Sequence, residues 1–188
     1  MITYRNNIRA SDIVAIEAIT RRTGFFREDE VAVAKELACE AVDSPNSLYR
    51  FVIAELNEET NGKVDTKIVG YTCYNKIECS LVSYDLDWIV VDKDMQGQHI
   101  GRALLLKTEE YILAEGGKFI YTETSSQPLY ESTRQFYLKC GYKLSAEFED
   151  FYDIGDNKLV FVKDCRTIVT VQDGGERSTG IPACVPNI

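Results

Sequence analysis

The stretch DKDMQGQHIGRAL, residues 92–104, organises this chain. It joins an extended apolar run, residues 86–91, to a run with helical periodicity that ends at a pair of glycines. A strand, a tight turn and a helix start are therefore expected. Gly97 and Gly101 leave room for a ligand beside the turn backbone. The first amides of a helix have no partner within it, so this turn is either a phosphate site or a purely structural junction.

Outward from this turn, length and composition indicate one domain. The chain has 188 residues, of which 45% are hydrophobic, enough for a full core. No segment approaches the roughly 20 apolar residues of a membrane span, and the N-terminus lacks the apolar run of a signal peptide. We therefore expect a cytoplasmic protein that does not enter a membrane.

The net charge and the cysteine pattern argue against a nucleic-acid-binding protein and a metal-binding protein. The net charge of −9 argues against nucleic acid, whose binding depends on Lys and Arg. Six irregularly spaced cysteines and a single histidine predict no metal site. Acidic residues crowd segments 28–43 and 147–156. This crowding indicates either a solvated surface or a field that attracts a cationic amine.

Periodicity and turn residues predict the element order. Asp12 with Ser11 is expected to cap the first helix, and Glu109 is expected on the exposed side of the helix after the turn. Phe25-Phe26 forms either a packed corner or, less favoured, the wall of a substrate pocket. The predicted strands are 2–5, 49–56, 67–74, 85–91, 118–123, 148–154 and 158–163, and the predicted helices begin near residues 13, 28, 100 and 131.

The connections are predicted from their composition. Residues 57–62 read as a hairpin loop, and Gly155-Asp156-Asn157 as a hairpin turn. Gly70, inside a strand, marks a bulge or a close backbone approach. Residues 165–188 have a flexible composition, apart from a short strand expected at 167–171. We therefore expect a domain over residues 1–164 and a loosely ordered tail over 165–188.

Two motifs together resemble the GNAT superfamily of acetyl-CoA-dependent N-acetyltransferases. The first is the turn QGQHIG, residues 96–101, in which His99 stands where the family usually has its middle glycine. The second is FYLKCGY, residues 136–142, an aromatic-Tyr pair followed by Gly and an aromatic residue. The resemblance covers about residues 2–163. It implies a mixed α/β (α+β) fold whose central sheet is mostly antiparallel, splayed and flanked by helices.

The resemblance also implies chemistry: transfer of an acetyl group from acetyl-CoA to a primary amine by direct attack. Tyr137 matches the family tyrosine that bonds the CoA sulfur, so it is the candidate general acid; the alternative is a core aromatic residue. Arg102 is the first candidate for a side-chain phosphate contact. The expected cofactor-binding residues lie on the strand and the turn: Ile89, Val90, Val91, Gln96, Gly97, Gln98, His99, Ile100, Gly101 and Arg102.

The general base is left open among strand carboxylates. Glu123 is the first choice and Asp87 the second, with Asp85 beside it; each could also be an ordinary solvated acid. Tyr130 stands where the family usually has Asn. That replacement leaves room for a non-catalytic acyl-CoA-binding regulatory module, and a plain interaction domain is the third possibility. Many proteins that the chain resembles are dimers, so a homodimer is expected.

Overall fold

The computed structural model describes residues 1–60 and 62–166. A seven-stranded sheet forms its centre, with α-helices on both faces. The elements in chain order are β1 (Ile2–Arg5), η1 (Ala10–Asp12), α1 (Ile13–Thr23), α2 (Glu28–Asp43), β2 (Arg50–Thr60), β3 (Lys63–Lys76), β4 (Ser83–Val91), η2 (Lys93–Met95), α3 (Ile100–Ala114), β5 (Phe119–Ser125), η3 (Pro128–Tyr130), α4 (Glu131–Lys139), β6 (Lys143–Asp153) and β7 (Asp156–Asp164).

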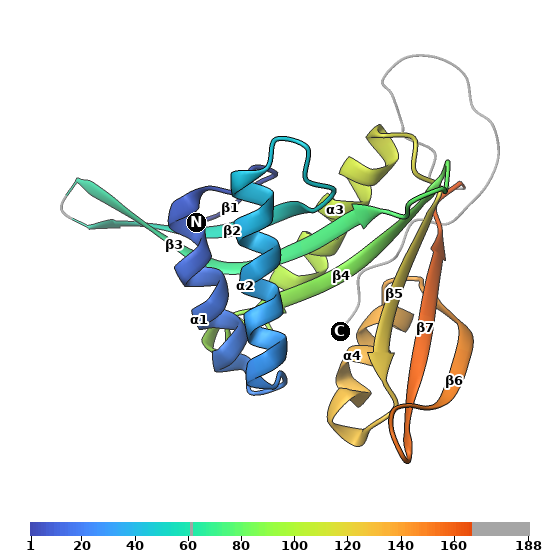
Figure 1. Ribbon diagram of the computed structural model, residues 1–188. Coiled ribbons are helices and arrows are strands. Elements are labelled where there is room, and N and C mark those ends of the chain that lie inside the picture. Colours follow the sequence, from blue (N-terminus) through green and yellow to red (C-terminus); the bar gives the residue numbers. More distant parts are fainter. Residues whose placement is uncertain (61, 167–188) are drawn as a thin grey trace, which may run out of the picture.

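The strands follow the order β1-β2-β3-β4-β5-β7-β6 across the sheet. Every neighbouring pair is antiparallel except β4 with β5. In Figure 1, strands β5, β7 and β6 swing away from β4, so the sheet opens between β4 and β5. This arrangement confirms the predicted mixed, mostly antiparallel and splayed sheet.

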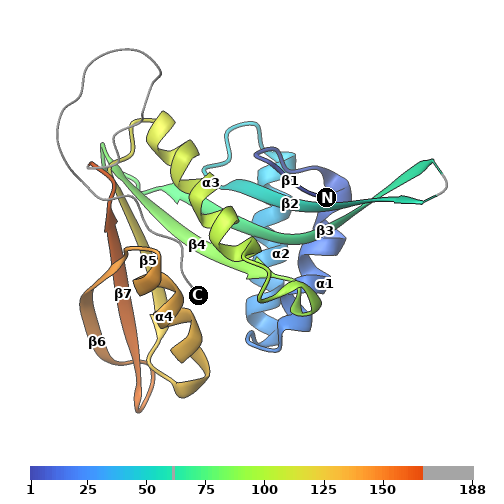
Figure 2. The same cartoon turned by 180° about the vertical axis from the view of Figure 1, so that it is seen from behind.

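The helices form two layers around the sheet. In Figure 1, α1 and α2 cover β2, β3 and β4 from the front. In Figure 2, α3 and α4 lie on the opposite face, α3 over β4 and α4 beside β5 and β7. Two apolar cores follow from these layers: Ile16 and Ile19 of α1 belong to one, and Leu104, Leu105 and Ile112 of α3 to the other.

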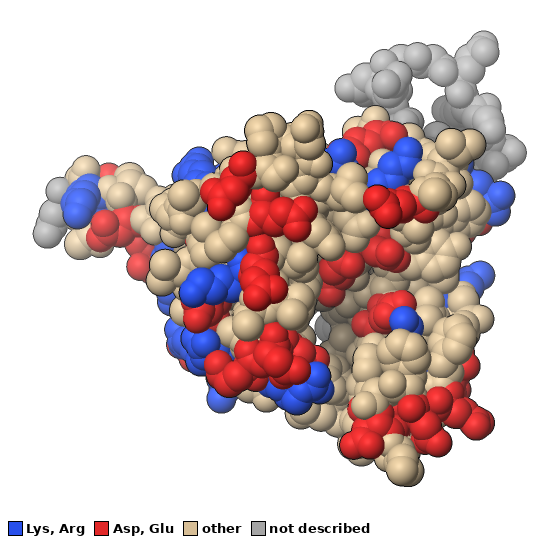
Figure 3. Space-filling model, in the orientation of Figure 1, with Lys and Arg blue, Asp and Glu red and all other residues tan. Residues whose placement is uncertain are grey.

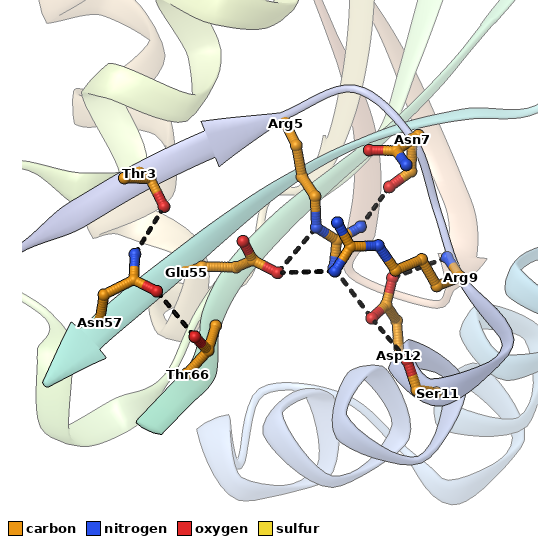
Figure 4. A network of polar contacts seen from close by, with 9 residues as sticks. All are labelled: Thr3, Arg5, Asn7, Arg9, Ser11, Asp12, Glu55, Asn57 and Thr66. Atoms are coloured by element: carbon orange, nitrogen blue, oxygen red, sulfur yellow. Dashed lines mark hydrogen bonds and ion pairs between the residues drawn. The ribbon is translucent and has the colours of Figure 1, made fainter. Parts of the chain in front are cut away.

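A polar network fixes the start of α1 (Figure 4). Arg5 of β1 donates to Glu55 Oε1 at 2.7 Å and to Asp12 Oδ1 at 2.9 Å. The Asp12 carboxylate also accepts the Arg9 amide at 2.7 Å, so it caps the short η1 turn rather than α1 itself. The side chains of Arg5, Asp12 and Glu55 are at most 15% exposed. The network therefore joins α1 to the first two strands.

Two predicted connections are shorter than expected. Residues 57–60 continue β2, whose pairing with β3 runs to Thr60 opposite Lys63. Gly62 has φ +76°, the left-handed conformation that favours glycine, and the strand pairing on either side of it outweighs the polar composition of residues 57–60. At the other hairpin β6 begins at Lys143, and β7 already starts at Asp156. The strand predicted over 167–171 lies outside the described residues.

The sequence-based predictions for Gly70 and for Glu109 had opposite outcomes. The pairing register shifts next to Gly70, and a Cβ there would meet the Val90 carbonyl oxygen at 2.8 Å. The predicted bulge and close approach are both present. In contrast, the prediction that Glu109 faces solvent is wrong, since this residue is only 2% exposed. Its charge is paired inside the fold with Lys163 of β7, a partner 54 residues away that helical periodicity cannot reveal.

Candidate active site

The opening between β4 and β5 creates the site. The two strands pair only where residues 83–85 meet residues 119–121. From Leu86 onward no residue of β4 is paired with β5, although both strands continue. A strand edge without a partner exposes backbone N–H and C=O groups. The Thr122 hydroxyl donates to one of them, Leu86 O, at 3.2 Å.

A β-bulge lies at the same place on the other edge of β4. Leu86 pairs with Tyr74 and Trp88 pairs with Cys73, so Asp87 is an extra residue that has no opposite residue in the strand pairing with β3. A bulge of this kind bends its strand and re-aims the side chains beside it. The bulge therefore accompanies the divergence of β4 from β5.

Beyond the bulge, the backbone N–H and C=O groups of β4 point alternately toward β3 and toward the opening. The Asp92 amide donates to Val69 O at 2.8 Å, which points the backbone of Asp92 toward β3. Hydrogen-bonding direction alternates along an antiparallel strand. The polar groups of Ile89 and Val91 therefore face the opening. Gln96 Nε2 donates to Val91 O at 3.3 Å and links this edge to the turn that follows.

Asp92 fixes the turn after β4 through its buried side chain. Its side chain is completely buried, accepts the Asp94 amide at 3.1 Å and pairs with Arg22 of α1 at 3.1 Å. Gly97 has φ +78° and His99 has φ +61°, the left-handed conformation that favours glycine. His99 thus adopts the backbone shape of the glycine that usually stands there, while its side chain lies in solvent.

The amides of the turn are available to a ligand. The backbone N–H groups of Gly97 to Arg102 donate no hydrogen bond to any atom in the described part of the chain. The first hydrogen bond of the helix runs from Ala103 N to His99 O at 3.0 Å. These groups lie at the positive end of the α3 dipole. At Gly101, a Cβ would approach no protein atom closer than Val91 Cγ2 at 3.5 Å. The protein itself therefore does not require glycine at position 101.

Tyr137 lies across the opening from β4. Its residue is 4% exposed, and its ring packs against Phe136, Tyr142 and Phe161 with centroids 5.5–5.9 Å apart. Thr122 Oγ1 donates to Tyr137 Oη at 3.1 Å. Thr122 has one hydroxyl proton. When Thr122 donates it to Tyr137 Oη, the phenol proton is free for another acceptor, and when Thr122 donates it to Leu86 O, the phenol can donate to Thr122 Oγ1 instead. Burial raises the pKa of Tyr137 to about 12.

Three strand carboxylates lie at the bend. Glu123 Oε2 is paired with Lys158 Nζ at 2.6 Å. Asp87 accepts a hydrogen bond from Asn75 Nδ2 at 2.8 Å, and no described Lys or Arg forms an ion pair with it. Although Asp87 contacts water, the surrounding protein removes much of its hydration, and this desolvation raises its pKa to about 6. Desolvation also raises the pKa of Asp85. Asp87 is thus the carboxylate best suited to exchange a proton near neutral pH.

Aromatic residues line the other side of the opening. Phe26 packs against Trp88 with centroids 4.9 Å apart, and Phe25 lies 6.1 Å from Tyr130. Tyr130 Oη donates to the carbonyl oxygen of Phe25 at 3.0 Å. The Phe25-Phe26 corner is therefore packed, as favoured from the sequence, and it also forms a pocket wall.

The edge of β4, the two glycines of the turn, Tyr137 and the aromatic wall line one open groove of about 770 Å³. In Figure 3, acidic side chains lie on both sides of the hollow between the α1–α2 part and the β5–β7 part of the molecule. Of the predicted site residues, the groove brings together Asp87, Ile89, Val90, Val91, Gln96, Gly97, Gly101, Glu123 and Tyr137. The groove lining does not include Gln98, His99, Ile100 and Arg102; Ile100 is buried in the core, and the other three are exposed.

Comparison with known proteins places this arrangement in a family. Residues 47–144 match the profile of the acetyltransferase (GNAT) domain. A solved structure assigned to the GNAT family of acetyltransferases, from Desulfovibrio desulfuricans, is 30% identical in sequence. It aligns with a TM-score of 0.79 over 88% of this chain and 99% of that one.

The chain belongs to the GNAT acetyltransferase family. More distant solved structures share the GNAT fold. The ribosomal-protein-S18-alanine N-acetyltransferase of Escherichia coli is 18% identical, with a TM-score of 0.64 over 92% of this chain and 99% of that one. An aminoglycoside 6'-N-acetyltransferase complexed with coenzyme A is 16% identical, with a TM-score of 0.63 over 88% and 97%. No curated protein matches the sequence significantly.

Residues 1–60 and 62–166 of this GNAT chain contain neither a candidate membrane span nor a candidate metal cluster. No helix in those ranges is long and apolar enough to cross a membrane. No group of three or more His, Cys, Asp or Glu side chains there could hold a metal ion. The GNAT family uses acetyl-CoA, and the groove offers free amides and a strand edge on which such a molecule could lie.

Several residues of the GNAT site were not predicted from the sequence. Thr122 contacts Tyr137, and Asn75 contacts Asp87. Tyr152 and Asp156 reach the groove from the β6–β7 hairpin. The first two contacts join residues on different elements, so no local pattern marks them. The one available signal is the period-two alternation of the strand, which places Thr122 on the same face as the buried Ile120.

Proposed function

We propose that this protein transfers the acetyl group of acetyl-CoA to the nitrogen of an amine. The observation that carries the proposal is that one groove is lined both by Gly97 and Gly101 of the free-amide turn and by Tyr137. A phosphate-binding turn alone would fit many nucleotides. A buried proton donor at the other end of the same strand edge fits a ligand with phosphates at one end and a reactive group at the other.

The turn and β4 would hold the cosubstrate. The amides from Gly97 to Arg102 can donate to diphosphate oxygens without any cost in protein hydrogen bonds. The backbone groups of Ile89 and Val91 can pair with the amide-containing arm as a neighbouring strand would. This pairing aligns the thioester with the bend in β4, and alignment is a large part of the catalytic effect in direct attack.

The acceptor end would prepare the amine. The groove lining there includes Glu30, Asp85, Asp87, Glu123 and Asp156, and these carboxylates attract a protonated amine. A protonated amine cannot attack, so one proton must leave first. Asp87 is the proposed base, directly or through a water, because its pKa is raised to about 6 and no cation among the described residues is paired with it. Glu123 is less suitable because Lys158 holds it.

The transfer then needs no nucleophile from the protein. The neutral amine nitrogen forms a bond to the thioester carbonyl carbon, while the bond from that carbon to sulfur breaks. The nitrogen gives up its second proton to water, which later returns a proton to the Tyr137 phenolate, and the sulfur leaves as a thiolate. Tyr137 is the proposed general acid, which donates its phenol proton to this sulfur. The products are an acetylated amine and CoA.

A calorimetric titration with acetyl-CoA, with ATP as the comparison, tests the cosubstrate site. Binding of acetyl-CoA well above ATP supports the proposal, and equal or absent binding contradicts it. A panel of amines then tests transfer: a diamine, an aminoglycoside, free amino acids and peptides with a free N-terminus or lysine, each followed by mass spectrometry for the added acetyl group. Binding without transfer to any amine would favour the non-catalytic acyl-CoA-binding module.

A further inference from the structure

A buried ion pair behind the groove has no part in the proposed transfer. Glu109 of α3 has a side chain only 3% exposed, and Lys163 of β7 one 14% exposed. Lys163 Nζ donates to Glu109 Oε2 at 2.6 Å and to the Cys140 carbonyl oxygen at 3.0 Å. Cys140 is the C-cap of α4, the helix that carries Tyr137. One ammonium group thus joins three elements: α3, β7 and the end of α4.

The same lysine also contacts the ring packing around Tyr137. Lys163 Nζ lies 5.5 Å from the centroid of the Tyr142 ring. The Tyr142 ring packs against the Tyr137 ring at 5.6 Å, and the Tyr142 amide donates to Tyr137 O at 3.0 Å. Phe161, two residues before Lys163 on the same face of β7, packs against Tyr137 from another side. Lys163 therefore touches both the backbone and the ring that hold Tyr137.

Stability alone does not account for this pair. Taking two charges out of water costs free energy, and replacing a buried ion pair by apolar groups of similar volume is often neutral or stabilising. Glu109 Oε1 and Tyr142 Oη make no hydrogen bond of ordinary geometry with any described residue, although the Glu109 carboxylate and the Tyr142 hydroxyl interact with each other. Because such a pair adds little to the free energy of unfolding, the role that we consider for it is to orient the elements that it joins. It joins α3, whose first turn is the cofactor turn, to the end of α4.

We infer that the Glu109–Lys163 pair positions the Tyr137 hydroxyl relative to the cofactor turn. Both are positioning residues, because neither lines the groove. The inference rests on the proposed role of Tyr137. It predicts that removal of the pair misplaces the proton donor while the turn, at the opposite end of α3, keeps its ligand.

CoA and desulfo-CoA provide a measurement that needs no acceptor amine. They differ by the sulfur, so the ratio of their affinities reports the contact between sulfur and Tyr137. At pH 9 a CoA thiolate accepts a charge-assisted hydrogen bond, which should make wild-type protein bind CoA about tenfold more tightly than desulfo-CoA. Tyr137→Phe should reduce that ratio to about one, with desulfo-CoA affinity unchanged.

The decisive variant replaces both charges, Glu109→Met with Lys163→Met. It should unfold at or near the wild-type temperature, since no buried charge is left unpaired. Its desulfo-CoA affinity should stay within about twofold of wild type, while the CoA to desulfo-CoA ratio falls at least about threefold. The matched control is Lys107→Met with Glu110→Met, which removes an exposed pair, 2.7 Å apart, from the same helix. The control should keep the wild-type ratio.

The outcomes separate the two claims. If Tyr137→Phe leaves the ratio unchanged, the acid assignment fails, and the inference falls with it. If Tyr137→Phe lowers the ratio but the double methionine variant keeps the wild-type value, only the inference is overturned. Should that variant fail to fold, Glu109→Gln keeps an acceptor for Lys163 and weakens the pair. Its ratio should then fall by a smaller factor, and an unchanged ratio overturns the inference.

Discussion

The proposed cofactor end of the groove and its proposed acceptor end are built from different parts of the chain. At the cofactor end, the turn and the edge of β4 offer backbone groups, and the side chains of Gln98, His99 and Arg102 lie in solvent. At the acceptor end, side chains from five separate segments converge: the α1–α2 connection, β4, β5, the segment around Tyr130 and the β6–β7 hairpin. Recognition at the first end should therefore tolerate side-chain changes, and recognition at the second should not.

The largest effect is expected where a side chain intrudes on the backbone end. Gly101→Val should weaken acetyl-CoA binding by more than about 10³-fold, because its branched side chain occupies the approach to the amides. Gly101→Ala is the control, since a Cβ there meets only ordinary contacts. Calorimetry measures both, and thermal unfolding checks that they fold. Equal affinity in the valine variant would show that the ligand does not approach position 101.

The next largest effect is expected at Asp87. Asp87→Asn should lower kcat/KM about 10²- to 10³-fold for an accepted amine. The raised pKa of Asp87, about 6, means that the wild-type base is ionised above that value and loses activity as pH falls through it. The variant should lose this acidic limb. An unchanged limb in the pH profile assigns the proton acceptor to another group.

Tyr137→Phe should lower kcat about 10²-fold while leaving acetyl-CoA affinity within about twofold. Only one oxygen is removed, and the ring keeps its packing against Phe136, Tyr142 and Phe161. Steady-state kinetics and calorimetry on the same preparation separate these two quantities. A proportional loss of affinity would mean that the hydroxyl holds the cosubstrate rather than serving its leaving group.

A smaller effect is expected at Glu123, the base first favoured from the sequence. Its ion pair with Lys158 leaves it poorly placed to accept a proton, so Glu123→Gln should lower kcat/KM by about fivefold or less. The acidic limb should remain. Loss of that limb in the Glu123 variant, with Asp87→Asn retaining it, would reverse the assignment of the two carboxylates.

The smallest change concerns the backbone end again. His99 holds φ +61°, so His99→Gly should raise the free energy of unfolding by about 0.5–1 kcal/mol and leave acetyl-CoA affinity unchanged. Gln98→Gly, at an exposed neighbour without a positive φ, is the matched control and should not stabilise. Chemical denaturation measures both. A clear loss of affinity in the glycine variant would show that the imidazole takes part in binding.

The same contrast explains what the sequence could reveal. The order of strands and helices, the turn at residues 96–101 and the short helix with Tyr137 are local patterns, and the structure has all three. The pairing of Glu123 with Lys158 and of Glu109 with Lys163 depends on which strands become neighbours. The bulge at Asp87 likewise depends on the register of β4 against β3. Such long-range contacts decide which carboxylate is free, and no local periodicity contains them.

The short parallel contact between β4 and β5 has a consequence for the dynamics of the protein before it binds acetyl-CoA. With pairing limited to residues 83–85 and 119–121, the two halves of the sheet share few backbone bonds. A bound acetyl-CoA would act as the missing strand between them, and a ligand that binds only the folded state stabilises it by mass action. The amides of Ile89 and Val91 should then exchange with deuterium more slowly in the complex, so the cosubstrate would complete the sheet as well as supply the acetyl group.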